Sequence, residues 1–330
     1  MTPPARPEPR PNGQHPDGQR PDRERPAYLR PAHLRQAIVL QVRQLVGGNG
    51  DDTVERNRRD VGFFGPDSAC WKVHGDLAGM MVGGIAALLV QMLHPGALAG
   101  VWDHSNFRKD MNGRLRRTAL FIAGTTYGDR AEAQGYIDRV RAIHGRVQGT
   151  LPDGTPYAAD DPDLLTWVHV AEVSSFLAGY LRYVDPAFPP SEQDRYYRET
   201  AEIARRLGAV SVPQSRAEVA EYFRAVRPQL RYDERTAEVA RALFSQTAPS
   251  AAAAPAMALA FDAAKDLLPP WAADMHRLRL SPARRLTARL GVQALGRTLR
   301  WALVNSAEAR ARRRAAELTA PLAAEDRPAA

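Results

Sequence analysis

Apolar residues recur at intervals of three and four positions along most of this chain, which is the spacing of an amphipathic helix. The pattern begins near Ala32 and continues nearly to the C-terminus. It predicts helices near residues 34–46, 76–93, 113–127, 130–147, 162–183, 191–207, 215–227, 232–245, 253–267 and 281–302. The alternating pattern of strands is scarce. The sequence therefore predicts an all-α fold, with a single helical domain over residues 32–304.

Capping residues support several of these boundaries. Asp129 precedes one helical pattern, and Asp161 precedes Pro162, which suits the first turn of a helix. Gly208 follows another pattern and is a typical C-terminal stop. The stretch GTLPDGTPYAA, residues 149–159, contains turn residues and predicts either a hairpin or a bare loop.

The most apolar stretch is LAGMMVGGIAALLVQML, residues 77–93. Its length is near the lower limit for a membrane span, and it contains several glycines. We therefore expect a buried central helix and no transmembrane span. Contact with a membrane surface through basic segments stays open.

The two ends of the chain differ from its middle. Residues 1–31 are rich in Pro, Arg, Asp and Gly and have almost no apolar side chains, so we expect them to be disordered. Residues 305–330 form a basic segment that we expect to be a frayed helix or disordered. These arginines contribute much of the net charge of +8. No nucleic-acid motif accompanies them, and we expect no nucleic-acid partner.

The overall composition is that of a soluble globular protein, with 44% hydrophobic and 25% charged residues among 330. Cys70 is the only cysteine, so no intramolecular disulfide can form, and a reducing cytoplasmic location fits. Prolines follow the first arginines where a signal peptide would be apolar, so we do not expect one. The oligomeric state is not predicted.

Arg114 and Thr118 lie one helical turn apart, beside an apolar stripe in GRLRRTALFIAGTTYG. A guanidinium and a hydroxyl so placed could hold a propionate, a phosphate or a bound oxygen species. The alternative is a surface arginine next to a threonine that bonds its own backbone. Spacing alone favours the second interpretation.

His144, in RAIHGRVQG, falls on the same helical stripe as Ile137, Val140 and Val147. A histidine on an apolar face, on the helix after an Arg/Thr pair, is what a haem pocket needs: a neutral imidazole for iron and a basic group for a propionate. On the pattern alone, a hydrogen-bonded core histidine is the more common case.

Three weaker candidates accompany these residues. His169 and Glu172 in WVHVAEVSSF share one helix face and could form a hydrogen bond, support another ligand or bind a metal. A di-iron site is poorly supported, because it needs several carboxylates and two Glu-x-x-His elements. His94 ends a predicted helix, where the helix dipole favours a histidine.

Several enzyme classes lack their signatures. The chain has no GxSxG motif, no GxGxxG motif after a strand and no Walker loop. Hydrolase and nucleotide-binding functions therefore have no support.

The order of several motifs resembles one known family. LHPGALAGVWDHS is followed by GRLRRT, AGTTYG, IHGRVQG and DPDLLTWVHV. Together they resemble the MpaB-like and rubber oxygenase (latex-clearing protein) catalytic domain over roughly residues 75–227. The resemblance implies an all-helical domain with a globin-like core and, in the rubber-cleaving branch, haem b. It also implies that His144 matches the axial iron ligand and that Arg114 and Thr118 match residues near the haem.

Two departures from the rubber-cleaving branch limit what the resemblance implies. That branch has a lysine just before the threonine, where this chain has Arg117, and arginine cannot act as a neutral iron ligand. It also has a glutamate base upstream of the arginine, where the nearest carboxylate here is Asp103. The resemblance therefore implies O2 chemistry on a smaller apolar or isoprenoid substrate.

Three functions remain open at this point. The first is a haem-dependent oxygenase or other oxidoreductase in which His144 binds iron and Arg114 and Thr118 act on the opposite side. The second is a non-catalytic helical protein that binds haem or an apolar ligand. The third is a helical interaction protein whose histidines are packed in its core.

Overall fold

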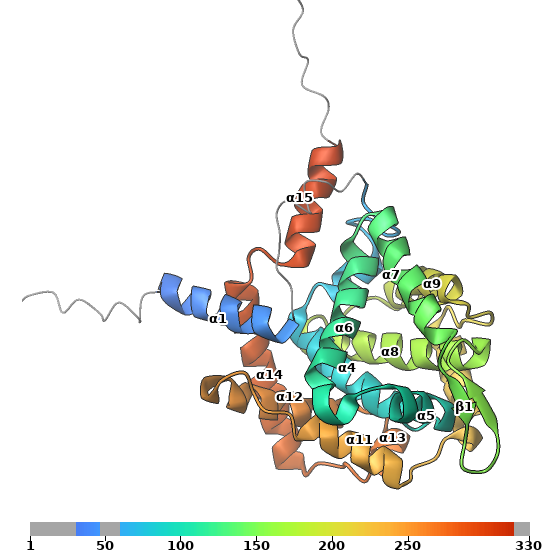
Figure 1. The fold of residues 1–330 in the computed structure, drawn as a ribbon. Helices are drawn as coiled ribbons and strands as arrows, with labels where there is room; N and C mark the ends of the chain where they lie inside the picture. Colours follow the sequence, from blue (N-terminus) through green and yellow to red (C-terminus); the bar gives the residue numbers. More distant parts are fainter. Residues whose placement is uncertain (1–30, 47–59, 320–330) are drawn as a thin grey trace, which may run out of the picture.

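The computed structural model describes residues 31–46 and 60–319, which form an all-α structure apart from one two-stranded sheet (Figure 1). The predicted fold class is confirmed. The expected disorder of residues 1–30 and 320–330 falls outside the described residues.

The helices are numbered as in Figure 1. They are α1 (Pro31–Val46), α3 (Ala69–His74), α4 (Leu77–Gln91), α5 (Pro95–His104), α6 (Phe107–Tyr127), α7 (Arg130–His144), α8 (Pro162–Tyr183), α9 (Pro190–Leu207), α10 (Arg216–Val226), α11 (Glu234–Phe244), α12 (Ala254–Leu267), α13 (Pro270–Met275), α14 (Pro282–Ala302) and α15 (Ala307–Thr319). The strands β1 (Gln148–Thr150) and β2 (Pro156–Ala158) pair antiparallel between α7 and α8, which confirms the hairpin.

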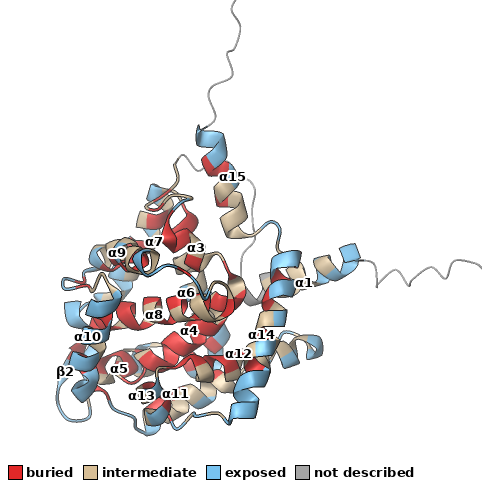
Figure 2. Ribbon diagram, turned by 180° about the vertical axis from the view of Figure 1, so that it is seen from behind, coloured by how far each residue is buried: buried red, intermediate tan, exposed pale blue. Residues whose placement is uncertain are grey.

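Helices α4 and α8 pack closely at the centre of the fold, where buried side chains concentrate (Figure 2). Glycines permit the contact, because a Cβ atom on Gly179 would lie 2.5 Å from the carbonyl oxygen of Gly79. A Cβ atom on Gly83 would lie 2.8 Å from the carbonyl oxygen of Ser175. Most residues of α4 are buried, so the expected central helix is confirmed.

Two parts of the described chain have the length and apolar composition of a membrane span. One is α8, and the other is α4 with α5, if this pair, bent by 102°, is counted as one span. Of the apolar window in α8, 67% is buried inside the protein. The core helix of a soluble protein meets the same criterion.

Helices α12 and α14 cover α4, and one buried carboxylate joins them to α8. The Asp266 side chain on α12 is 1% exposed and accepts from three arginines. Its distances are 2.9 Å to Arg182 Nη1 on α8, and 2.6 Å each to Nε of Arg285 and Arg289 on α14. These ion pairs lower the pKa of Asp266, although burial acts in the opposite direction.

Helices α6 and α7 lie side by side and run antiparallel, since only Gly128 and Asp129 connect them (Figure 1). The Asp129 side chain accepts a hydrogen bond from the backbone nitrogen of Glu132 and caps α7, as expected. Helix α6 begins six residues before the predicted start at 113, and its backbone is kinked at Asp110 (φ −141°, ψ 56°).

The structure differs from the expectation after residue 304. Helix α15 packs against α6, and its Ala311 belongs to the same buried cluster as Ala69 and Trp71 of α3. Ala315 is also buried. Arg314 is buried as well, and its Nη2 atom donates a 2.7 Å hydrogen bond to the carbonyl oxygen of Tyr127. Residues 307–319 are therefore a docked helix, because alanines and one paired arginine let a basic segment approach the core.

Three short helices, α3, α5 and α13, were not predicted. Each has ten residues or fewer, which is too short for a clear helical period. Pro95 marked the end of the preceding helix in the sequence, but it also begins α5. The role expected for His94 is therefore wrong: it caps the N-terminus of α5, where its Nδ1 accepts from the backbone nitrogen of Gly96 at 3.2 Å.

Candidate functional site

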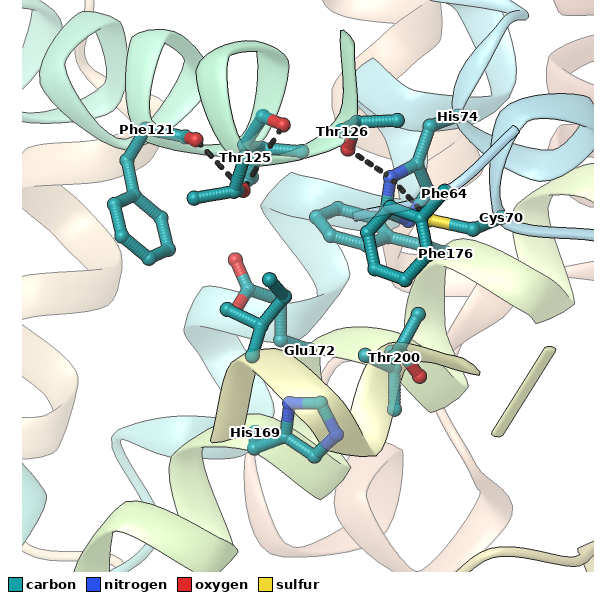
Figure 3. A pocket seen from close by; sticks show the side chains of 13 residues that line it. Phe64, Cys70, His74, Phe121, Thr125, Thr126, His169, Glu172, Phe176 and Thr200 are labelled. Carbon is teal, nitrogen blue, oxygen red and sulfur yellow. Dashed lines mark hydrogen bonds between the residues drawn. The ribbon is translucent and has the colours of Figure 1, made fainter. Parts of the chain in front are cut away.

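A small cavity lies between α3, α6, α8 and α9 (Figure 3). Its volume of about 40 Å³ gives room for roughly two or three water molecules. Most of its wall is apolar, and a minority of polar groups project toward it. The lining side chains are Phe64, Cys70, His74, Phe121, Ile122, Thr125, Thr126, His169, Glu172, Val173, Phe176, Thr200 and Ile203.

His74 at the end of α3 holds one wall of this cavity together. Its Nδ1 lies 2.8 Å from the hydroxyl of Thr126 on α6, and its Nε2 lies 2.9 Å from the hydroxyl of Tyr196 on α9. Burial and the nearby ring of His169 lower the pKa of His74 to about 3. The imidazole is therefore neutral at physiological pH and fully occupied by hydrogen bonds.

Cys70 lies one turn before His74, with its Sγ 3.6 Å from Nδ1 of that ring. Burial and the charge of Glu199 raise the pKa of the thiol. A protonated thiol is a poor nucleophile. The cysteine is therefore a packing residue of the cavity wall.

His169 and Glu172 lie one turn apart on α8 and both project toward the cavity (Figure 3). Burial and the charge of Arg205 lower the pKa of His169 to about 4, while burial raises the pKa of Glu172 to about 7. The Nε2 atom of His169 is buried without a hydrogen-bond partner among the described residues. The sequence prediction that these two residues share one face is confirmed.

Arg114 and Thr118 lie outside the cavity lining, on the N-terminal half of α6. Arg114 Nη1 donates a long hydrogen bond of 3.4 Å to the Ser105 hydroxyl, and Thr118 Oγ1 donates to the carbonyl oxygen of Arg114 at 3.3 Å. Burial and the charge of Arg117 lower the pKa of Arg114 to about 10, so it stays cationic at neutral pH. In the described structure the two side chains do not form a joint clamp.

His144 is the last residue of α7 and is half-buried. Its Nδ1 atom is buried without a hydrogen-bond partner among the described residues. Burial lowers the pKa of the ring, and the nearby Asp160 carboxylate opposes this effect. A neutral imidazole is the form that binds a metal ion.

The hairpin geometry brings Arg114 and His144 to the same end of the α6–α7 pair. Arg114 lies 13 residues before the end of α6 at Tyr127, and His144 lies 14 residues after the start of α7 at Arg130. At about 1.5 Å per residue, each lies roughly 20 Å from the connecting turn. Thr118 lies one turn from Arg114, so the predicted trio shares one region of the hairpin.

Two other histidines have structural partners. The ring of His94 lies 5.8 Å from that of Trp167, in addition to its capping bond. His104 Nε2 lies 3.1 Å from the carbonyl oxygen of Gln148 on β1. Neither lines the cavity.

Sequence reasoning missed the α3 and α6 groups of the cavity wall. Cys70 and His74 are spaced by four residues, which was a usable sign of a shared helix face. Thr125 and Thr126 gave no such sign, because their place in the cavity depends on how α6 packs.

The comparison with known families gives one match. The family described as "ER-bound oxygenase mpaB/B'/Rubber oxygenase, catalytic domain" matches residues 71–301, which is most of the chain. The chain belongs to this family. Its oxygenase character is thus a property of the family, and the matched span contains Arg114, His144 and most of the cavity wall. No curated protein and no solved structure matches the chain.

The residues of this oxygenase-family chain fit a haem in their chemistry. His144 offers a neutral imidazole with a free buried nitrogen, and Arg114 offers a cation whose one hydrogen bond is long. Among the described residues, no group of three or more His, Cys, Asp or Glu side chains could hold a metal ion without a cofactor. His144, Arg114 and Thr118 do not line the cavity described above, which is itself much smaller than a haem.

Proposed function

We propose that the protein is a haem-dependent oxygenase that acts with O2 on an apolar, isoprenoid-like substrate. The observation that carries the proposal concerns His144. Its buried Nδ1 has no hydrogen-bond partner in the described part of the chain and lies at the same end of the α6–α7 hairpin as Arg114. An unsatisfied buried polar atom is unfavourable for folding and is often explained by a ligand. Membership of the oxygenase family supports the same assignment.

Each of the three residues has a part in this proposal. His144 would bind the iron of haem b through a neutral ring nitrogen. Arg114 would pair with a propionate, since it is cationic and only weakly engaged by Ser105. Thr118 is exposed, and its hydroxyl would turn from its backbone bond toward a bound ligand. A bound haem would supply the redox chemistry that activates O2.

The side chains next to this region support the proposed substrate class. Phe121 and Ile122 continue α6 beyond Thr118 and are only half-buried. Val173 and Phe176 face them from α8 across the cavity. These groups favour an apolar substrate over a charged one.

Oxygen consumption by haemin-loaded protein tests this function. With squalene as the isoprenoid probe, we expect haemin-dependent uptake of O2 that Arg114→Ala lowers by about a hundredfold, as when a preorganised charged group is removed. Arg139→Ala is the matched control, because Arg139 is an exposed arginine on α7. Haem binding without O2 uptake would instead support carriage or sensing of the haem.

A further inference from the structure

Two ionisable side chains of α8 share the cavity, Glu172 and His169, one turn apart. The Nε2 atom of His169 is buried and has no hydrogen-bond partner among the described residues, and Glu172 is half-buried. In Figure 3 the Glu172 carboxyl points into the space below Phe121 and Thr125 of α6. Buried polar atoms are normally paired, so the unpartnered His169 nitrogen in the same cavity as the Glu172 carboxyl group indicates a bound partner such as water.

The rest of the wall does not satisfy these groups. Thr125 Oγ1 donates to the carbonyl oxygen of Phe121 at 2.8 Å, and Thr200 Oγ1 donates to the carbonyl oxygen of Tyr196 at 2.9 Å. His74 is occupied by Thr126 and Tyr196 as described above. The cavity has room for roughly two or three waters, which is enough to bridge Glu172 and His169.

The face of α6 that carries Arg114 and Thr118 leads along the helix to the cavity. Residues 114, 118, 122 and 125 follow one another at intervals of four and three, so they share one helix face. Ile122 and Thr125 line the cavity, and Thr118 lies about 6 Å along the axis from Ile122. A short chain of waters can span that distance.

On the premise of the proposed function, we propose that Glu172 is the proton acceptor of the oxygenase site and that His169 is a positioning residue for the water that carries the proton. In this step a C–H bond of the substrate breaks, and its electron pair enters the C–O bond that forms to O2, which is reduced to the peroxide level. The proton passes through water to a Glu172 carboxylate oxygen, where an O–H bond forms. The reverse transfer returns the proton to the product or to solvent.

The charges around Glu172 suit this role. Burial raises the pKa of Glu172 to about 7, which is close to the working pH of a general base. The titratable groups that face the cavity are His169 on α8 and Cys70 and His74 on α3. Tyr196, Glu199 and Arg205 of α9 act electrostatically on this group of residues. Helix α4 carries no titratable side chain.

Titration of the carboxyl group in haem-free protein tests the inference without catalysis. In protein labelled with ¹³C at the glutamate carboxyl, the Glu172 resonance is identified by its loss in Glu172→Gln. We expect its midpoint near pH 7. A midpoint near 4.5, the ordinary value for glutamate, would overturn this inference and leave the proposed function standing.

The kinetics of the haemin-loaded protein test the catalytic part. We expect Glu172→Gln to lower kcat by about a hundredfold or more with little change in KM and to abolish the rise of kcat near pH 7. Glu172→Asp should restore part of kcat. Glu202→Gln should match wild type, because the Glu202 carboxylate of α9 pairs with Arg206 and does not line the cavity. An unchanged pH profile in Glu172→Gln would overturn the role. A wild-type protein that consumes no O2 would contradict the proposed function itself.

Discussion

The Nε2 atom of His74 lies 2.9 Å from the hydroxyl of Tyr196, a residue 122 positions later in the chain. This contact ties α3 to α9 across one end of the cavity. Tyr196 is fully buried, and burial raises the pKa of its hydroxyl, so the group stays neutral and available for the hydrogen bond. The cavity wall is therefore fixed by a hydrogen bond between two neutral side chains.

Removal of this hydrogen bond is expected to destabilise the protein. Tyr196→Phe leaves the His74 nitrogen without a partner inside the protein, at a cost of about 1–3 kcal/mol in the free energy of unfolding. Chemical denaturation with urea measures the change. Tyr232→Phe is the control, because Tyr232 is exposed. Equal stability of the two variants would contradict the proposed importance of the contact.

The pH dependence of stability carries two opposite contributions from the cavity. Burial lowers the pKa of His74 to about 3 and of His169 to about 4, from 6.5. As the pH falls below 6.5, the unfolded chain therefore binds protons that the folded protein does not, and the free energy of unfolding decreases. The decrease ends once the pH is below the folded-state pKa values of His169 and His74. Burial raises the pKa of Glu172 from 4.5 to about 7. The Glu172 carboxyl group therefore reduces the free energy of unfolding as the pH rises from 4.5 to about 7.

Glu172→Gln separates the two contributions. Well below pH 4.5, Glu172 is largely protonated in both states, and the substitution should change little through ionisation. Above pH 7 the variant avoids burial of a charge and should gain stability relative to wild type. Urea unfolding from pH 4.5 to 8 measures the difference. A difference that stays constant over this range would show that Glu172 has an ordinary pKa.

The central helix contact should be sensitive to one methyl group. Gly179→Ala places a Cβ atom 2.5 Å from the carbonyl oxygen of Gly79, and both atoms belong to packed helices. We expect a loss of about 1–3 kcal/mol in the free energy of unfolding, as for other overpacked cores. Gly135→Ala on α7 is the matched control, because its Cβ would meet nothing within 4 Å. Similar effects of both substitutions would contradict this account of the α4–α8 contact.

Asp266 should be the most important carboxylate for the packing of α8, α12 and α14. Asp266→Asn leaves three arginines without their common charge, and breaking a buried ion pair on one side typically costs about 3–5 kcal/mol. The arginines are partly exposed, so we expect the lower end of this range. Thermal unfolding measures the loss. Asp274→Asn, which affects an exposed pair with Arg279, should behave like wild type.

Much of the fold was predictable because long helices repeat their apolar spacing many times. The predicted helix at 162–183 has the boundaries of α8, and the predicted helix at 76–93 is α4 with its ends shifted by one or two residues. Short helices such as α5 offer too few repeats. The docking of α15 could not be predicted from ARARRRAAE. It depends on the hydrogen bond from Arg314 to the carbonyl oxygen of Tyr127, a residue distant in the sequence.

The candidate site was predictable only in part, for a similar reason. The spacing of three residues between His169 and Glu172 predicted that they share one helix face. The short turn between α6 and α7 predicted that Arg114 lies toward the C-terminal end of α7. The cavity itself lies between four helices. The hydrogen bonds of His74 with Thr126 and Tyr196 join residues far apart in the sequence, so no local spacing predicts them. The roles of Arg114, Thr118 and His144 toward haem stay predictions.

A haemin titration, followed by absorption spectroscopy and iron analysis, tests the central claim most directly. We expect wild-type protein and His104→Ala to bind one haem per chain with a sharp Soret band, and His144→Ala to lose that band while remaining folded by circular dichroism. His104 is the matched control, because it is an exposed histidine that bonds to β1 and lies against Tyr157. Wild-type protein that stays colourless with haemin, or a Soret band that is unchanged in His144→Ala, would contradict the account.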